Sequence, residues 1–276
     1  MSFIWGKGEG QRISVAGLSL ECASWGPSPA HAPTFVLLHE GLGSTALWKD
    51  FPQKLAAATG FGVFAYSRAG YGASDPVKLP RPLDYMPKEA QDVLGPLLDA
   101  IGFERGILLG HSDGATIAAW YAASVSDQRI RGLCLIAPHF FTEDKGLAAI
   151  AEAKTAYETG ELKARLAKYH NHVDVAFKGW NEAWLDPAFK DMNVADCIDH
   201  WRIPVLAIQG REDQYGTLAQ IGEIEDRIYS PLEVAILENC RHAPQFDQPE
   251  QTLSAITDFA QRLERLEQEQ VLTAAV

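Results

Sequence analysis

Residues 110–114 of this 276-residue chain, Gly-His-Ser-Asp-Gly, constrain its fold more than any other stretch. They match the pattern G-x-S-x-G, follow an apolar run at 106–109 and precede small residues at 115–119. This context predicts a strand, a sharp turn and a helix, in which Ser112 projects from the top of a sheet as a nucleophile. The two glycines suit such a turn because a side chain on either would crowd the strand or the helix. The alternative is an ordinary strand-to-helix turn with an incidental serine.

Apolar runs typical of strands alternate with helical stretches along most of the chain. We expect strands in two short runs within 13–25 and at 34–39, 63–66, 106–110, 133–137, 204–208 and 232–237. Helices are expected at 44–59, 86–101, 217–228 and from Pro249 onward, and Pro96 should kink or break the second of them. This alternation predicts an α/β fold with a mostly parallel, roughly eight-stranded sheet and helices on both faces.

The pattern changes between residues 139 and 200, where strand-like runs disappear and aromatic residues are dense. Helical stretches at 148–158 and 162–169 take their place. We therefore expect a core domain in two parts, 1–138 and 201–276, with a helical cap inserted at 139–200. An insertion at this point would overhang the carboxyl ends of the strands, where parallel sheets bind ligands.

A nucleophilic serine needs a histidine as base, and that histidine needs a carboxylate to orient it. His242 follows the expected strand 232–237, and Asp213 follows the strand 204–208. Both therefore lie on loops at the same edge of the sheet as Ser112. Asp213 alone could be a helix cap, and a loop histidine alone could be a solvent-facing residue. Glu212 competes for the acid role, but an extended backbone would turn its side chain the other way.

Acyl transfer also needs two N–H donors for the developing oxyanion. The first expected donor is the backbone of Asp113, directly after the serine. The second is expected from the loop 39–44, His-Glu-Gly-Leu-Gly-Ser, whose glycines allow close approach to a substrate. We favour Gly41, with Leu42 as the alternative donor. A plain glycine-rich turn is the competing interpretation of this loop.

Five stretches together carry a family resemblance: 39–44, 67–75, 110–114, 210–213 and His242. The chain resembles the α/β-hydrolase superfamily, in the serine-nucleophile branch that carries a helical cap. The resemblance implies that Ser112, Asp213 and His242, in that chain order, form the catalytic triad. It also implies that residues 139–200 form the cap.

Two positions depart from the family pattern. The loop at 39–41 reads His-Glu-Gly, where many relatives have His-Gly-x. Asp113 stands where an apolar residue or glycine is more usual. A carboxylate at that position favours neutral or cationic substrates over anionic ones.

The elbow residue narrows the chemistry. Dehalogenases and epoxide hydrolases of this superfamily carry an aspartate there, whereas this chain has Ser112. The leading hypothesis is therefore a serine hydrolase that cleaves a small carboxylic ester or lactone; thioesters and amides are further acyl substrates. The residues expected to line the substrate pocket are His39, Glu40, His139, Trp180 and Trp184, although either tryptophan could equally belong to the core of the cap.

Two other functions stay open. The first is a carbon–carbon bond hydrolase or lyase on the same triad, with Arg68 as a charged group near the site. Arg68 could instead support the turn 70–72. The second is a ligand-binding receptor that keeps the fold but has little catalytic activity.

Composition limits the partners. There are 36 acidic and 24 basic residues, a formal net charge of −12, and no Lys/Arg cluster. We expect a small-molecule substrate and neither nucleic acid nor an anionic membrane surface as partner; a homo-oligomer is compatible with the sequence. Four scattered cysteines without C-x-x-C spacing, and the separation of His170 from His172, predict no metal and no cofactor. With no signal-peptide pattern and no apolar run of membrane-spanning length, we expect a cytoplasmic protein.

Overall fold

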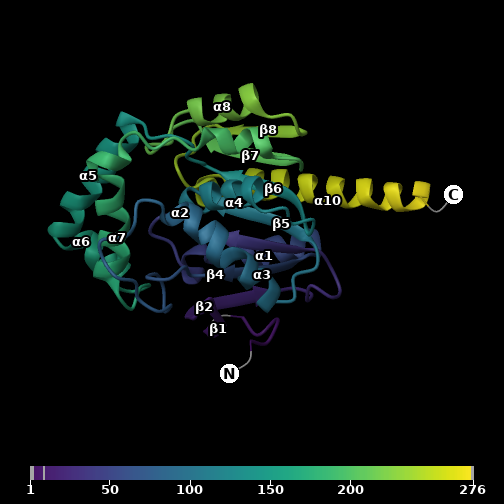
Figure 1. Ribbon diagram of the computed structural model, residues 1–276, viewed down its shortest axis with the longest axis horizontal. Coiled ribbons are helices and arrows are strands. Elements are labelled where there is room, and N and C mark those ends of the chain that lie inside the picture. Colours follow the sequence, from purple (N-terminus) through teal and green to yellow (C-terminus); the bar gives the residue numbers. More distant parts are fainter. Residues whose placement is uncertain (1–2, 9, 275–276) are drawn as a thin grey trace.

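A computed structural model describes residues 3–8 and 10–274 and places an eight-stranded sheet between two layers of helices (Figure 1). The strands are β1 (Gln11–Val15), β2 (Leu18–Trp25), β3 (Thr34–Leu38), β4 (Gly62–Tyr66), β5 (Gly106–His111), β6 (Ile130–Ile136), β7 (Val205–Gly210) and β8 (Leu232–Leu237). Their order across the sheet is β1-β2-β4-β3-β5-β6-β7-β8. The pairs β1–β2 and β2–β4 are antiparallel, and all others are parallel. The predicted fold class is confirmed.

Continuous apolar runs form the central strands because both faces of the sheet are covered. In β3 all five residues are buried. Phe35 and Leu37 join the hydrophobic cluster on one face, and Val36 and Leu38 join the cluster on the other. The helices around the sheet are η1 (Thr45–Trp48), α1 (Phe51–Thr59), α2 (Tyr85–Lys88), η2 (Glu89–Leu94), α3 (Gly95–Ala100), α4 (Asp113–Ser124), α8 (Ala219–Arg227), α9 (Pro244–Asp247) and α10 (Pro249–Ala274).

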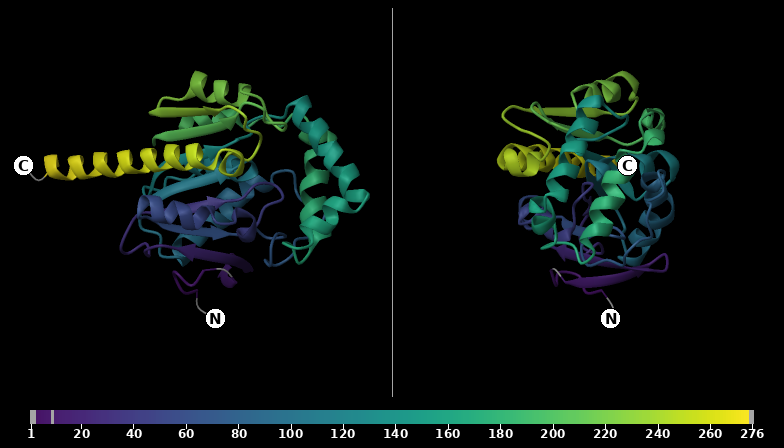
Figure 2. Two further views of the ribbon diagram at one scale, coloured as in Figure 1. Left: turned by 180° about the vertical axis from the view of Figure 1, so that it is seen from behind. Right: turned by 90° about the vertical axis from the view of Figure 1, so that its left-hand side faces the viewer.

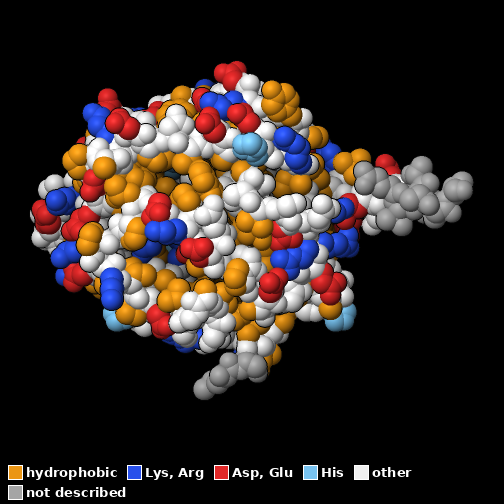
Figure 3. All heavy atoms as spheres, in the orientation of Figure 1, with side chains coloured by type: hydrophobic (Ala, Val, Ile, Leu, Met, Phe, Trp, Pro, Cys, Tyr) orange, Lys and Arg blue, Asp and Glu red, His pale blue; other side chains and the backbone are white. Residues whose placement is uncertain are grey.

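The two faces carry different helices. Helices α1 and α10 supply residues to the cluster that contains Phe35, whereas α2, α3, α4 and α8 supply residues to the cluster that contains Val36. The far end of α10 projects past the edge of the sheet, away from α5, α6 and α7 (Figure 2). Among the helices described, none is long and apolar enough to cross a membrane. On the face of the molecule that Figure 3 shows, acidic and basic side chains are interspersed.

Pro96 neither breaks nor ends the helix that contains it. Instead α2, the π-helical segment η2 and α3 follow one another without interruption from residue 85 to residue 100. Proline has no N–H to donate to the carbonyl one turn earlier, and a wider π turn accommodates that loss. The predicted disturbance at Pro96 is thus a change of helical pitch in the turn before it.

Between β6 and β7 the described chain contains helices and no named strand. These helices are α5 (Asp144–Glu158), α6 (Glu161–Leu166), α7 (Val173–Trp184), η3 (Pro187–Phe189) and η4 (Ala195–His200). Helices α5, α6 and α7 stand together at one end of the sheet (Figures 1 and 2). An antiparallel bridge between Phe141 and Asn193 ties the two ends of this stretch together. The division into 1–138, 139–200 and 201–276 stays a prediction.

Candidate active site

Ser112 occupies the sharp turn between β5 and α4. Its φ of +55° and ψ of −120° lie outside the regions that side chains favour, so the turn holds this residue under strain. Its N–H donates to the Ile136 carbonyl over 2.9 Å. A Cβ on Gly110 would lie 2.2 Å from the Gly114 carbonyl oxygen, and one on Gly114 would lie 2.0 Å from the Leu38 carbonyl oxygen. The turn therefore requires both glycines.

The candidate acid and base are in direct contact. Asp213, on the loop after β7, has its Oδ2 atom 2.8 Å from Nδ1 of His242, on the loop after β8. Nδ1 therefore donates to the carboxylate, and Nε2 is left as the basic nitrogen. Ser112 and His242 line the same cavity. This arrangement can support nucleophilic attack by the serine with the imidazole as general base.

Asp213 is held as a carboxylate by its surroundings. Its Oδ1 atom accepts from the Tyr215 N–H over 2.7 Å, and its Oδ2 atom accepts from Nε2 of Gln209 over 2.7 Å. Burial acts to raise the pKa of Asp213, but the hydrogen bonds from His242 and Tyr215 outweigh it and hold the pKa below its usual value. Glu212 points elsewhere, since its Oε2 atom accepts from the Cys240 N–H over 2.7 Å.

The loop after β3 reaches the same cavity. Neither the N–H of Gly41 nor that of Leu42 donates to a backbone carbonyl of the residues that the structure describes. Both residues line the cavity with Asp113. Space above Gly41 is filled by the indole of Trp180, because a Cβ there would lie 2.2 Å from Nε1. The choice between Gly41 and Leu42 as donor stays a prediction.

Two side chains hold this loop in place. The guanidinium of Arg68 donates to the His39 carbonyl and, over 3.0 Å, to the Glu40 carbonyl. His170 accepts from the Gly72 N–H at Nδ1 and donates from Nε2 to the Leu42 carbonyl over 3.0 Å. The hydrogen bonds of Arg68 thus go to the loop after β3, whereas His170 links that loop to the turn 70–72.

The cavity has a volume of about 90 Å³. Its lining residues are Glu40, Gly41, Leu42, Ser112, Asp113, His139, Ile150, Trp180, Trp184, Tyr215 and His242. Glu40, His139, Trp180 and Trp184 therefore border it, as expected of pocket residues. His39 does not. Its ring is fully buried, where Nε2 accepts from the Arg68 N–H over 3.0 Å and Nδ1 donates to the Glu40 carbonyl over 2.7 Å. The expectation for His39 is corrected: it fixes the loop from behind.

His139 is a neutral ring beside the candidate base. Its ring centroid lies 5.5 Å from that of His242 and 5.4 Å from that of Trp184. Burial, aided by the charge that His242 can carry, lowers the pKa of His139 to about 3. At neutral pH this ring can therefore offer one donor and one acceptor without adding charge to the cavity.

Sequence patterns missed several residues of the site. Tyr215 packs edge-on against His242 with 4.7 Å between ring centroids. Tyr85 donates from its hydroxyl to Oδ2 of Asp113 over 2.5 Å and accepts from Nε1 of Trp184 over 3.1 Å. No motif marks either tyrosine. The only signal for Tyr215 is its position two residues after Asp213.

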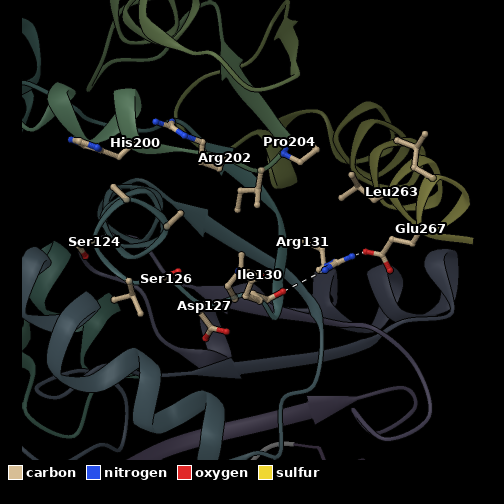
Figure 4. Close-up of a pocket in the computed structure, with 16 residues that line it drawn as sticks. Ser124, Ser126, Asp127, Ile130, Arg131, His200, Arg202, Pro204, Leu263 and Glu267 are labelled. Atoms are coloured by element: carbon tan, nitrogen blue, oxygen red, sulfur yellow. Dashed lines mark hydrogen bonds and ion pairs between the residues drawn. The ribbon is translucent and has the colours of Figure 1, made fainter. Parts of the chain in front are cut away.

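A larger cavity, about 590 Å³, lies at the opposite edge of the sheet, between the end of α4, the start of β6 and α10 (Figure 4). Its Arg131 is paired with Glu267 over 2.7 Å, as Figure 4 shows. None of the triad candidates lines it. The chemistry expected of Ser112 therefore points to the smaller cavity.

Over residues 3–8 and 10–274 there is no group of three or more His, Cys, Asp or Glu that could hold a metal ion.

Known proteins resemble this chain in sequence and in fold. A family model described as "alpha/beta hydrolase fold" matches residues 33–153. "Epoxide hydrolase 2" of Siraitia grosvenorii is 30% identical over 130 residues, which are 46% of this chain and 38% of that relative. The chain therefore matches well under half the length of this curated relative.

Solved structures match over nearly the whole chain. The enol-lactonase from Burkholderia xenovorans LB400 superimposes with a TM-score of 0.69 at 20% identity, covering 90% of this chain and 99% of that one. A thermophilic esterase from Thermogutta terrifontis gives a TM-score of 0.70 at 18% identity, covering 92% and 99%. With the serine elbow and the sheet order, these matches lead to one conclusion. The chain has the α/β-hydrolase fold.

Proposed function

We propose that the chain is a serine hydrolase that cleaves a small carboxylic ester or lactone through an acyl-enzyme on Ser112. One observation carries the proposal: His242, paired with Asp213 over 2.8 Å, and the strained Ser112 border one cavity. The cavity volume of about 90 Å³ corresponds to roughly three water molecules at ~30 Å³ each, which favours short acyl or alcohol groups.

In this mechanism Ser112 Oγ attacks the carbonyl carbon while Nε2 of His242 takes the hydroxyl proton. The carbonyl oxygen becomes an oxyanion, for which the N–H of Asp113 and that of Gly41 or Leu42 are the donors we assign. When the intermediate collapses, the bond to the alcohol oxygen breaks and His242 returns the proton to that oxygen. Water then repeats the attack on the acyl-enzyme, with His242 again as base, and releases the acid and free Ser112.

Although one relative is an epoxide hydrolase, a serine nucleophile at position 112 does not suit epoxide opening. Attack of a serine hydroxyl on an epoxide carbon would leave an ether on Ser112. Ethers resist attack by water, whereas the ester formed by an aspartate nucleophile can be hydrolysed. We therefore assign acyl rather than alkyl transfer to this site.

We also propose a cytoplasmic location, which the four free cysteines support.

Labelling with a fluorophosphonate, followed by turnover of p-nitrophenyl acetate and butanoate, tests the proposal. We expect wild type to be labelled at Ser112 and to cleave both esters. Ser112→Ala should lose the label and about 10⁶ in kcat, as in other serine triads. Ser126→Ala, which alters an exposed serine outside the cavity, is the control and should behave as wild type. Undiminished turnover by Ser112→Ala would exclude the acyl-enzyme.

Carbon–carbon cleavage is distinguished in the same assay. Wild-type turnover of a vinylogous diketone without cleavage of esters or lactones would assign the triad to that reaction. Labelling of Ser112 without turnover of any acyl substrate would instead support a receptor that retains a reactive serine.

A further inference from the structure

We propose that this cavity selects substrates that carry an ammonium group with at least one N–H, on either the acyl or the alcohol part of the ester. The proposal rests on the serine hydrolase function above and specifies its substrate class. It starts from Asp113, the residue after Ser112, which borders the cavity and whose buried carboxylate has one oxygen unpaired.

One carboxylate oxygen of Asp113 has no hydrogen-bond donor in the part of the chain that the structure describes, and a ligand could supply one. The Asp113 side chain is fully buried, and Oδ2 accepts from the Tyr85 hydroxyl over 2.5 Å. Oδ1 has no hydrogen-bond partner among the described residues. A buried carboxylate oxygen without a donor is costly, and a ligand N–H placed against it would remove that cost.

The charges around the cavity favour a cation. Asp113 and Glu40 are both among the lining residues, whereas no Lys or Arg is. The cation paired with Asp113 is Arg68, whose Nη2 atom lies 4.0 Å from Oδ2 of Asp113. Its two terminal nitrogens donate to the carbonyls of His39 and Glu40, on the loop behind the cavity. Burial raises the pKa of Asp113, and the charge of Arg68 opposes that rise without lining the space that a ligand would fill.

The walls of the cavity add a second preference for positive charge. Trp180, Trp184 and Tyr215 line it together with Asp113 and Glu40. The π faces of such rings attract cations, and tryptophan does so most strongly. Aromatic walls with a carboxylate suit an ammonium ion better than a neutral hydroxyl. The unpaired Oδ1 atom adds the requirement for an N–H, which a quaternary ammonium lacks.

Pairs of ester substrates with nearly the same shape but different charge test the effect of the ammonium group alone. Benzyl 4-aminobutanoate and benzyl pentanoate differ by an ammonium in place of a methyl group. Benzyl 4-hydroxybutanoate tests a neutral donor, and benzyl 4-(trimethylammonio)butanoate tests a cation without N–H. We expect kcat/KM for the aminobutanoate to exceed each of the others at least tenfold. Comparing 4-aminobutyl acetate with pentyl acetate tests the same preference on the alcohol part of the ester.

Variants assign the preference to the carboxylates. In Asp113→Asn the ratio of kcat/KM for the ammonium substrate to that for its methyl counterpart should fall at least tenfold, and in Glu40→Gln it should fall less. The control is Asp50→Asn, which removes the same charge from an exposed residue paired with Lys54 outside the cavity. This control should keep the wild-type ratio.

A binding measurement separates this inference from the proposed function. With Ser112→Ala protein, n-butylammonium should raise the thermal midpoint at concentrations at least tenfold lower than 1-butanol does. Equal effects of the two compounds would overturn the inference, whether or not wild type is an esterase and whether or not Asp113→Asn folds. Equal or faster turnover of the methyl counterparts on both parts of the ester would also overturn it, while leaving the serine hydrolase intact. Absence of labelling and of all ester turnover would reject the hydrolase alone.

Discussion

Nε2 of His111 donates to the backbone carbonyl of His242 over 2.7 Å, so the residue before the candidate nucleophile holds the loop of the candidate base. Nδ1 of His111 accepts from the Gln245 amide over 3.2 Å, which fixes this tautomer. The two imidazoles lie 5.1 Å apart between ring centroids. The distance between serine and base is thus set in part by a side chain that takes no part in the chemistry.

Replacing His111 should misplace His242. We expect His111→Ala to lower kcat about 10- to 100-fold with a smaller change in KM, because the His242 carbonyl is left without its donor, at a cost of about 1–3 kcal/mol. His111→Gln offers a donor in a similar place and should recover part of the loss. Steady-state kinetics with p-nitrophenyl butanoate measure both. A kcat that is unchanged in His111→Ala would show that other contacts position His242.

Asp213→Asn should abolish most of the activity. An amide oxygen and amino group replace the carboxylate, so His242 loses the charged acceptor for its Nδ1–H and the tautomer with a basic Nε2 is no longer favoured. In serine triads this substitution lowers kcat by about 10⁴, and we expect a loss of that order. Glu212→Gln is the matched control, since Glu212 accepts from the Cys240 N–H instead, and its kcat should stay within a few-fold of wild type. Equal losses in the two variants would reassign the acid.

The sequence predicted which loops carry the site because each candidate residue lies at most five residues after an apolar run. Ser112 follows β5, Asp213 follows β7 and His242 follows β8. In a parallel sheet these strands end at one edge, so local patterns suffice to place the three residues there. The pairing of His242 with Asp213 then requires only that the two loops be neighbours, which the adjacency of β7 and β8 ensures.

Side-chain directions within the site could not be predicted because distant contacts decide them. His39 was expected in the pocket, but its ring turns away to accept from the Arg68 N–H, 29 residues later. Tyr85 reaches Asp113 from α2, which packs against α4, and His170 joins Gly72 across 98 residues. None of these contacts follows from periodicity or motif spacing, since each depends on how the helices pack.

Gly41→Ala should impair catalysis through Trp180. The new Cβ would lie 2.2 Å from the indole Nε1 atom, so the loop or the indole must move. Loss of one oxyanion donor lowers kcat about 10²–10³-fold, and we expect a loss approaching this range if the loop moves. Removing the indole should relieve the clash. The Gly41→Ala substitution should therefore lower kcat less in the Trp180→Ala protein than it does in wild type.

Gly222→Ala provides the control for that experiment. Gly222 lies in α8 with no atom within 4 Å of an added Cβ. Alanine is the better helix former by about 1 kcal/mol, so this variant should be at least as stable as wild type with unchanged kcat. If Gly41→Ala also kept full activity, the loop would not hold a donor at this position.

His139 should make the protein less stable as the pH falls below neutral. In the folded protein the pKa of His139 is lowered from 6.5 to about 3, chiefly by burial, whereas in the unfolded chain the ring regains its ordinary pKa. Between these two values the unfolded chain binds more protons, so lowering the pH favours unfolding by up to about 1.4 kcal/mol per pH unit. His139→Gln does not titrate and escapes this effect. Urea denaturation at pH 7, 6 and 5 should therefore show the free energy of unfolding of His139→Gln rising relative to that of wild type as the pH drops. Burial also lowers the pKa of His39 and of His170, but both residues are present in both proteins, so their effects cancel from the comparison. A difference that stayed constant across this range would mean that the ring of His139 is already protonated, or solvated, in the folded state.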